Sequence, residues 1–279
     1  HSPFNAPKRY WDLYKRPDIP LPANPEWPDA APRIAWHDSR EILGRAAQKR
    51  KLSDEAVREI RHGYLANISY LDAQVGKVLD ELDRLQLTEK TIIVFWSDHG
   101  YHLGEHSLFA KTSNFDLDAR VPLMIAMPGA GTARKKTEAL AELLDLYPTL
   151  SALCHLPPPA QVEGVSLVPV LKDASATVRK IALTQHPRPA YYNQTPAGVP
   201  THMGYSIRTE HYRYTEWRDW DSGKTVATEL YDHRADPDET RNIAQDQDEM
   251  PVAAEHARLL QELNPAVQPG WKPALERKQ

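Results

Sequence analysis

Residues 91–111, TIIVFWSDHGYHLGEHSLFAK, decide the interpretation of this chain. The run Thr91–Trp96 is rich in β-branched residues, as in a strand covered on both faces, and the polar pair Asp98 and His99 follows it directly. Ligands bind at the carboxyl ends of strands in α/β sheets, because the loops there carry chemistry while the strand stays packed. The stretch therefore predicts a strand of an α/β sheet that ends in part of a metal-assisted catalytic site.

The composition is that of a globular protein, since 41% of the 279 residues are hydrophobic and 26% are charged. No apolar stretch approaches the roughly 20 residues needed to cross a bilayer, so we predict no membrane span. A formal net charge of −4 provides no broad basic surface, which argues against nucleic acid as a partner. Cys154 is the only cysteine, which excludes an internal disulfide, and we expect it to be a buried structural thiol.

The first third of the sequence predicts a surface segment and then a long helix. Prolines crowd residues 1–33 and disfavour both helix and central strand, whereas the aromatic residues there indicate that the segment is pinned to the body of the protein. Apolar residues then recur every three or four positions over Val57–Leu85, after Ser53 as a candidate N-cap. This spacing predicts a helix with one apolar face.

The order of the later elements predicts an α/β layer followed by a small subdomain. A second strand is predicted at Val121–Met127 and a helix at Leu140–Leu153, which Pro148 kinks or divides. A polar stretch of small residues suggests a linker, so we place one domain at residues 1–174 and an α+β subdomain at residues 175–279. The predicted strands and final helix of this subdomain are Ile181–Thr184, Gly204–Thr209, Tyr212–Trp217, Glu229–Tyr231 and Val252–Leu263.

The loop between the first two predicted strands contains the residues best suited to chemistry. Asp98 offers carboxylate oxygens and His99 an imidazole nitrogen, so the pair can bind a cation, although such pairs also cap helices and fill turns. Lys111 suits a sulfate or phosphate oxygen, or proton donation to a leaving group, but taken alone it is a solvated amine. His102 and His106 are predicted to pack in the loop or to orient neighbouring groups.

Several segments resemble the type I sulfatases and, within them, the iduronate-2-sulfatase group. The strongest is SDHGYHLGEHSLFAKTSNFD at residues 97–116, followed by RVPLMIAMPG at residues 120–129. Further similar segments, in order, are HSPFNAPKRYWDLY, YLANISYLDAQVGKVLDELDRLQL, LLDLYPTL, QHPRP, MGYSIRT and YRYTEW. The resemblance covers nearly the whole chain and implies an α/β fold, the alkaline-phosphatase-like sulfatase sandwich with a small C-terminal α+β subdomain.

The resemblance also implies roles for individual residues. Asp98 and His99 match ligands of one Ca²⁺ ion that also binds the sulfate, although an imidazole by itself would equally suit zinc. Lys111 matches a lysine that contacts the sulfate and the leaving oxygen. His1 matches a histidine that reaches the ester oxygen, whereas its position alone predicts a frayed terminus. Two further positions match residues of the pocket wall, namely Tyr101 and Leu103.

One departure from the family pattern concerns the nucleophile. Sulfatases use a formylglycine made from the first residue of a Cys/Ser-x-Pro-x-Arg motif, and an acidic pair completes their metal site. In this sequence Cys154 is followed by His155, Leu156 and Pro157, so the proline is one place late and the arginine is missing. We therefore expect a C-terminal part of a sulfatase, with an N-terminal sulfatase chain or segment as partner and a sulfated carbohydrate, such as a uronate 2-sulfate, as substrate. The resemblance suggests a periplasmic, secreted or lysosomal location.

Two other hypotheses stay open. Asp-His-Gly after a strand also suits a two-metal phosphoryl site, which would make the protein a phosphodiesterase or phosphonate hydrolase of the alkaline phosphatase superfamily. If the missing nucleophile is taken literally, the chain is instead a binding or assembly subunit without activity. Arg208 suits a second anion clamp, but an ion pair that links the subdomains is the simpler interpretation.

Overall fold

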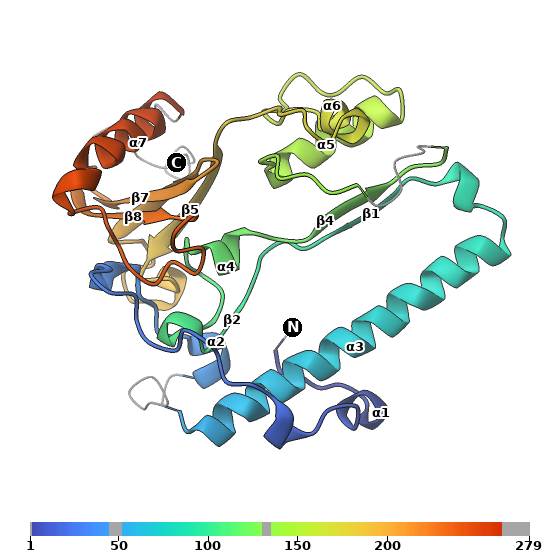
Figure 1. Cartoon of the computed structure of the whole chain (residues 1–279), viewed down its shortest axis with the longest axis horizontal. Coiled ribbons are helices and arrows are strands. Elements are labelled where there is room, and N and C mark those ends of the chain that lie inside the picture. The colour runs from blue at the N-terminus through green and yellow to red at the C-terminus, as the bar shows by residue number, and fades with distance from the viewer. Residues whose placement is uncertain (1, 45–51, 130–134, 264–279) are drawn as a thin grey trace. The chain divides into compact units, whose positions relative to one another are not determined.

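The computed structural model describes residues 2–44, 52–129 and 135–263 (Figure 1). The described residues form two compact units that interleave along the chain. The first unit draws on His1–Trp27, Asp38–Lys111 and Arg120–Ala130, and the second on Pro28–His37, Thr112–Ala119 and Gly131–Gln279. The division that we predict between residues 174 and 175 stays a prediction.

Helices and strands are mixed along the chain (Figure 1). The α-helices are α1 (Lys8–Trp11), α2 (Arg40–Leu43), α3 (Asp54–Arg84), α4 (Asp116–Ala119), α5 (Leu146–Leu153), α6 (Val168–Lys172) and α7 (Met250–Leu263). The strands are β1 (Ile93–Trp96), β2 (His102–Leu103), β3 (Phe109–Ala110), β4 (Leu123–Ala126), β5 (Ala182–Arg188), β6 (His202–Arg208), β7 (Tyr212–Asp219) and β8 (Thr225–Asp232). Short 3₁₀ turns lie at Arg16–Asp18, Arg33–Ala35, Thr88–Lys90, Glu105–Ser107, Leu143–Asp145, Tyr192–Gln194 and Gln247–Glu249.

Helix α3 of the first unit confirms the helix predicted from the apolar spacing. The Ser53 hydroxyl accepts a hydrogen bond from the backbone N–H of Ala56 at 3.3 Å, which satisfies one of the free donors at the helix start. Several apolar side chains on α3 are exposed, among them Ile68, Leu71 and Val78. The helices in the described part of the chain include none that is both long and apolar enough to cross a membrane.

The N-terminal segment is pinned to α3, as predicted. The Trp11 ring stacks on the His62 imidazole with centroids 4.1 Å apart, and the Tyr14 hydroxyl lies 2.7 Å from the Ser69 hydroxyl oxygen. The expectation that prolines exclude helix from this segment is wrong at α1. Pro7 stands at the N-cap of that one-turn helix, where a missing N–H breaks no intrahelical bond.

Strands β1 and β4 confirm the two strands predicted on either side of the polar loop, and they pair antiparallel from Ile93 opposite Ala126 to Trp96 opposite Leu123. The expectation that the first strand is covered on both faces is wrong. Within the described part of the chain, Trp96 is 46% exposed and Met124, on β4, is 58% exposed.

Two predictions for the segment between β4 and β5 need correction. The helix predicted over Leu140–Leu153 begins only at Leu146, and Pro148 lies in its first turn, so the proline neither kinks nor divides it. Cys154 is exposed and is not a buried thiol, since it stands at the C-cap of α5, where the chain leaves the helix.

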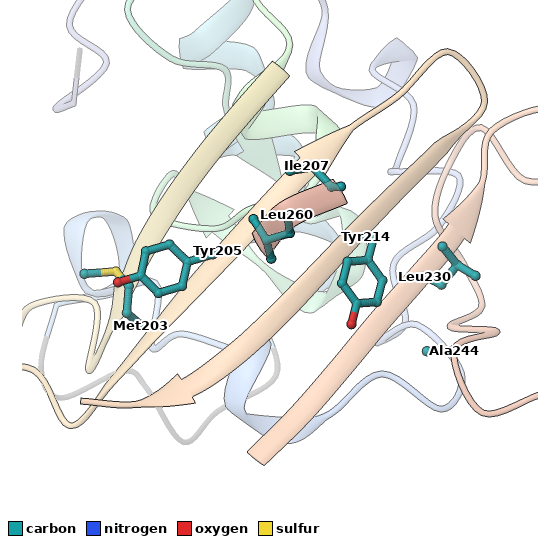
Figure 2. Packing of buried hydrophobic residues seen from close by; sticks show 7 residues of the cluster. All are labelled: Met203, Tyr205, Ile207, Tyr214, Leu230, Ala244 and Leu260. Carbon is teal, nitrogen blue, oxygen red and sulfur yellow. The ribbon is translucent and has the colours of Figure 1, made fainter. Parts of the chain in front are cut away.

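Strands β5 to β8 form one antiparallel sheet in sequence order, and α7 covers one of its faces, which confirms the strands and final helix predicted for the C-terminal part. Because side chains alternate between faces, every second residue of β6 points to α7. Figure 2 shows the resulting core of the second unit, with Leu260 of α7 among side chains of three strands. Its members are Met203, Tyr205, Ile207, Tyr214, Leu230, Ala244 and Leu260.

The opposite face of this sheet is buried but polar. The Arg213 guanidinium lies 2.5 Å from a carboxylate oxygen of Glu239, and the Trp217 indole donates to Glu229 at 2.8 Å. Gly204 is opposite Trp217 in the register, and a Cβ there would lie 2.7 Å from the indole ring, so the position requires glycine. Arg208 lies 3.9 Å from Asp116 in an ion pair within the second unit, while its predicted role of linking two subdomains stays a prediction.

Candidate active site

The predicted metal ligands lie directly after β1 in the first unit. The Ser97 hydroxyl donates to the carbonyl of His99 at 2.8 Å and stabilises the turn. His99 Nδ1 lies 2.8 Å from the Gly100 carbonyl, which can only accept, so Nδ1 carries a proton and, in the neutral ring, Nε2 presents its lone pair. That Nε2 lies 3.7 Å from a carboxylate oxygen of Asp98. The turn thus presents two adjacent ligand atoms.

This pair fits part of a metal centre. The Asp98 side chain is 74% exposed, so its oxygens are accessible, and the His99 tautomer suits a metal ligand. Among the described residues, no three His, Cys, Asp or Glu side chains come together as a possible metal site. Since Ca²⁺ takes six to eight oxygen-rich ligands, Asp98 and His99 would need further ligands to hold it.

Lys111 follows the β2–β3 hairpin and reaches a carboxylate that the sequence analysis did not identify. Its ammonium lies 2.7 Å from Glu41 Oε2, and the two side chains are 19% and 15% exposed. The Tyr101 hydroxyl donates to Glu41 Oε1 at 3.2 Å, and the Ser2 hydroxyl donates to the same oxygen at 3.0 Å. Glu41 therefore connects two predicted site residues, Lys111 and Tyr101.

The environment of Glu41 keeps its carboxylate ionised at neutral pH. Burial raises the pKa of Glu41, but hydrogen bonds from Lys111 and Ser2, together with the Lys111 charge, outweigh burial and lower this pKa below its ordinary value. No local pattern in the sequence marks Glu41, because it lies in a four-residue helix far from Lys111 along the chain. Only the loop contacts of α2 bring the two together.

The Tyr101 ring lies near both His99 and Lys111. Its centroid is 6.4 Å from that of the His99 ring, and the Lys111 ammonium lies 6.0 Å from the Tyr101 ring centroid. Tyr64 stacks on Tyr101 at 5.6 Å, and Phe4 meets it edge-on at 5.8 Å. These contacts pack Tyr101 among other aromatic rings beside the Lys111 ammonium, while its role as a sugar-binding residue stays a prediction.

Leu103 is held mainly through its backbone. Its N–H donates to Glu105 at 2.7 Å, and its carbonyl accepts from Arg61 at 3.2 Å. Burial raises the pKa of Glu105, but hydrogen bonds from the backbone and from Arg61 lower it to a greater extent. These groups fix the β2–β3 hairpin next to α3, while the contribution of Leu103 to a pocket wall stays a prediction.

Glycine and histidine residues complete the hairpin that leads to Lys111. Gly104 has φ of +108°, and a Cβ there would lie 3.0 Å from Pro22, so this turn favours glycine. His102 and His106 are buried and face each other, with Nε2 of the first 3.4 Å from Nδ1 of the second. They pack within the loop, in agreement with the packing role predicted for them. His1 lies outside the described residues.

Comparisons with known proteins show which family the chain belongs to. The family described as Sulfatase matches residues 1–156, and the family described as N-sulphoglucosamine sulphohydrolase, C-terminal, matches residues 104–266. The iduronate 2-sulfatase of Mus musculus is 36% identical, with 95% of this chain and 58% of that protein covered. The choline-sulfatase of Rhizobium meliloti is 33% identical, with 88% of this chain and 44% of that protein covered.

Solved structures share the fold. A structure described as a 2-O GAG sulfatase has a TM-score of 0.76 at 26% identity, covering 89% of this chain and 52% of its own. The phosphonate monoester hydrolase from Silicibacter pomeroyi has a TM-score of 0.79 at 24% identity, covering 96% and 54%. The chain thus spans about half the length of the proteins it matches. It belongs to the type I sulfatase family, in the iduronate-2-sulfatase-like group, and has the α/β fold of the alkaline-phosphatase-like sulfatases.

Proposed function

We propose that this chain supplies half of the active site of a sulfatase that hydrolyses sulfate esters of sulfated saccharides. The observation that carries the proposal is the arrangement around Tyr101. The His99 imidazole, with Asp98 beside it, has its ring centroid 6.4 Å from that of Tyr101, and the Lys111 ammonium lies 6.0 Å from the same ring. A cation and a candidate metal ligand pair on one rigid loop suit a tetrahedral oxyanion such as a sulfate ester.

In this proposal each predicted site residue has a separate role. Asp98 and His99 hold one Ca²⁺ ion, and Lys111 binds a sulfate oxygen and assists the leaving oxygen with a proton. His1 is proposed to reach the ester oxygen, and Tyr101 to border the sugar. When bound, Ca²⁺ supplies charge neutralisation and formylglycine supplies the nucleophile.

The remaining parts of the site are proposed to come from an N-terminal sulfatase chain or segment. The 279 residues contain no Cys/Ser-x-Pro-x-Arg motif, and Asp98 with His99 provides only two ligands. The exposed apolar side chains of β1, β4 and α3 support such a partner, since large exposed apolar patches mark interaction surfaces. The described side chains that would contact it include Trp96, Met124, Ile68, Leu71 and Val78.

For the substrate we propose a uronate 2-O-sulfate in a polysaccharide or oligosaccharide. Support comes from similarity to two iduronate 2-sulfatases, 36% and 34% identical, and from the solved 2-O GAG sulfatase. The likeness to phosphonate monoester hydrolases is below 25% identity and concerns the fold, so sulfate esters are the favoured substrate over phosphonates.

The test uses the native protein, purified with any polypeptide that accompanies it and characterised by intact mass. It is assayed on 2-O-sulfated uronate disaccharides, on 6-O-sulfated glucosamine and on a phosphonate monoester. We expect sulfate release from the first substrate, lost on chelation and restored by Ca²⁺. Lys111→Ala should lower kcat/KM by about 10²–10³-fold. The matched control Lys90→Ala, at an exposed position, should not.

Three results would contradict the proposal. Cleavage of the phosphonate without cleavage of any sulfate ester would identify a phosphonate hydrolase. No cleavage by a preparation that contains formylglycine would favour a binding subunit. Full activity of Lys111→Ala would show that the assignment of Lys111 is wrong.

A further inference from the structure

We propose that Glu41 is a positioning residue, which holds the Lys111 ammonium and the Tyr101 hydroxyl in place for the bound sulfate ester. The inference rests on the proposed function of Lys111. No motif in the sequence suggests a role for Glu41. The proposed role is also separate from those of the metal ligands and the nucleophile. The evidence for the positioning role consists of contacts within the first unit.

The carboxylate of Glu41 uses both oxygens on separate partners. Oε2 lies 2.7 Å from Lys111 Nζ, while Oε1 accepts from Ser2 at 3.0 Å and from Tyr101 at 3.2 Å. These donors come from two distant stretches of the chain, Ser2 near its start and Tyr101 with Lys111 in the motif loop. One partly buried carboxylate therefore joins the N-terminal segment, the tyrosine of the motif loop and the lysine that follows it.

The backbone that carries Glu41 is itself attached to the hairpin that ends at Lys111. The Ser39 hydroxyl accepts a hydrogen bond from the backbone N–H of Phe109 in β3, at 2.9 Å. Arg40 pairs with Asp38 at 2.7 Å across the turn before α2. Since α2 and β3 are joined at this point, Glu41 meets Lys111 at a defined distance.

Ordering Lys111 in advance matters because a lysine side chain has four rotatable bonds and a compact charge. A free ammonium would have to lose that freedom when the sulfate binds, and a misplacement near 1 Å can lower the rate of an enzyme by about 10²-fold. The ionic contact with Glu41 aligns the ammonium before the substrate arrives. The same carboxylate fixes the Tyr101 ring, over which Lys111 lies at 6.0 Å.

An opposite role would be competition, in which Glu41 occupies Lys111 until a sulfate displaces it. The two roles predict different kinetics. A positioning residue, when removed, lowers kcat and leaves KM nearly unchanged, whereas a competitor, when removed, lowers KM and preserves kcat. The experiment below separates them.

The test uses the complete enzyme with Glu41→Gln, which keeps most of the side-chain volume and removes the charge. Glu142→Gln is the matched control, because Glu142 is also a partly buried glutamate, 17% exposed, in an ion pair with an arginine, Arg179, at 3.2 Å. Glu41→Gln should lower kcat by about 10- to 100-fold with KM within about threefold of wild type. Glu41→Asp, which keeps the charge, should recover part of this loss.

A second readout does not depend on activity. Acetylation of Lys111 by acetic anhydride is followed by mass spectrometry, with the exposed Lys90 of the same chain as internal reference. Glu41→Gln should raise the ratio of Lys111 to Lys90 acetylation severalfold, and Glu142→Gln should leave it unchanged. Circular dichroism of each variant checks that the fold is retained.

The outcomes distinguish this inference from the proposed function. Wild-type kcat in Glu41→Gln, a lowered KM at constant kcat, no recovery in Glu41→Asp, or an unchanged acetylation ratio would each overturn the positioning role. If the wild-type enzyme releases no sulfate, the proposed function fails. The acetylation ratio then still decides whether Glu41 holds Lys111.

Discussion

Replacing Glu239 by glutamine probes the buried ion pair on the polar face of the second sheet. Glu239 accepts from Arg213 at 2.5 Å and lies 2.8 Å from His233 Nε2, and its second oxygen accepts from the backbone N–H of Asp116 at 2.9 Å. The side chains of Arg213 and Glu239 are 2% and 1% exposed. Glutamine keeps the shape but leaves the Arg213 charge without its nearest counterion.

The expected loss of unfolding free energy is about 3 kcal/mol. Removing one partner of a buried ion pair costs about 3–5 kcal/mol, because the other charge stays buried and uncompensated. Burial raises the pKa of Glu239, but the charge of Arg213 and hydrogen bonds from His233 and Arg213 lower it from 4.5 to about 2. That difference corresponds to about 3 kcal/mol. Glu229 lies 4.0 Å from Arg213 and would compensate part of the Arg213 charge, so we expect a loss at the lower end of the range of about 3–5 kcal/mol.

The pKa of Glu239 also predicts how the effect depends on pH. A carboxylate whose pKa is lower in the folded state stabilises the protein above the unfolded value of 4.5, and this stabilisation is lost as the pH falls toward about 2. The difference between wild type and Glu239→Gln should therefore be full at pH 7. It should shrink steadily between pH 5 and about pH 2.

Urea unfolding, followed by tryptophan fluorescence, measures both effects. The matched control is Glu262→Gln, since Glu262 also pairs with an arginine, Arg258, but both side chains are about 60% exposed. Exposed pairs contribute about 0–1 kcal/mol, so the control should change little. A loss below about 1 kcal/mol for Glu239→Gln, or one equal to that of the control, would refute the reasoning.

Three further predictions test individual positions. Gly204→Ala should lower stability by about 1–3 kcal/mol, because its Cβ would lie 2.7 Å from the Trp217 ring, and an unchanged urea midpoint would contradict this. Ser53→Ala should destabilise the first turn of α3 by about 1 kcal/mol through loss of the cap on Ala56, measured by amide hydrogen exchange against the helix centre. Asp98→Asn should weaken Ca²⁺ binding to the complete enzyme at least about tenfold by calorimetry, and an unchanged Kd would remove Asp98 from the metal site.

Local patterns predicted the regular elements well. The spacing of apolar residues over Val57–Leu85 corresponds to α3, because this pattern reflects which face of the helix is apolar. The short strands predicted in the C-terminal part correspond to β5 to β8. Errors arose where a residue's environment depends on distant parts of the chain. Cys154 and Trp96 are examples. Both are exposed, and the sequence around each residue does not indicate which other parts of the chain would cover it.

The sequence by itself determined the family, the strand that ends in Asp98 and His99, and the presence of Lys111 in the same loop, because these features lie within one short stretch. Only the tertiary structure decided that Glu41 meets Lys111 and that the Tyr101 ring lies beside both His99 and Lys111. An ion pair between distant residues requires no periodicity or motif in either segment. It forms because α2 is attached to β3, and that attachment appears only when the chain is folded.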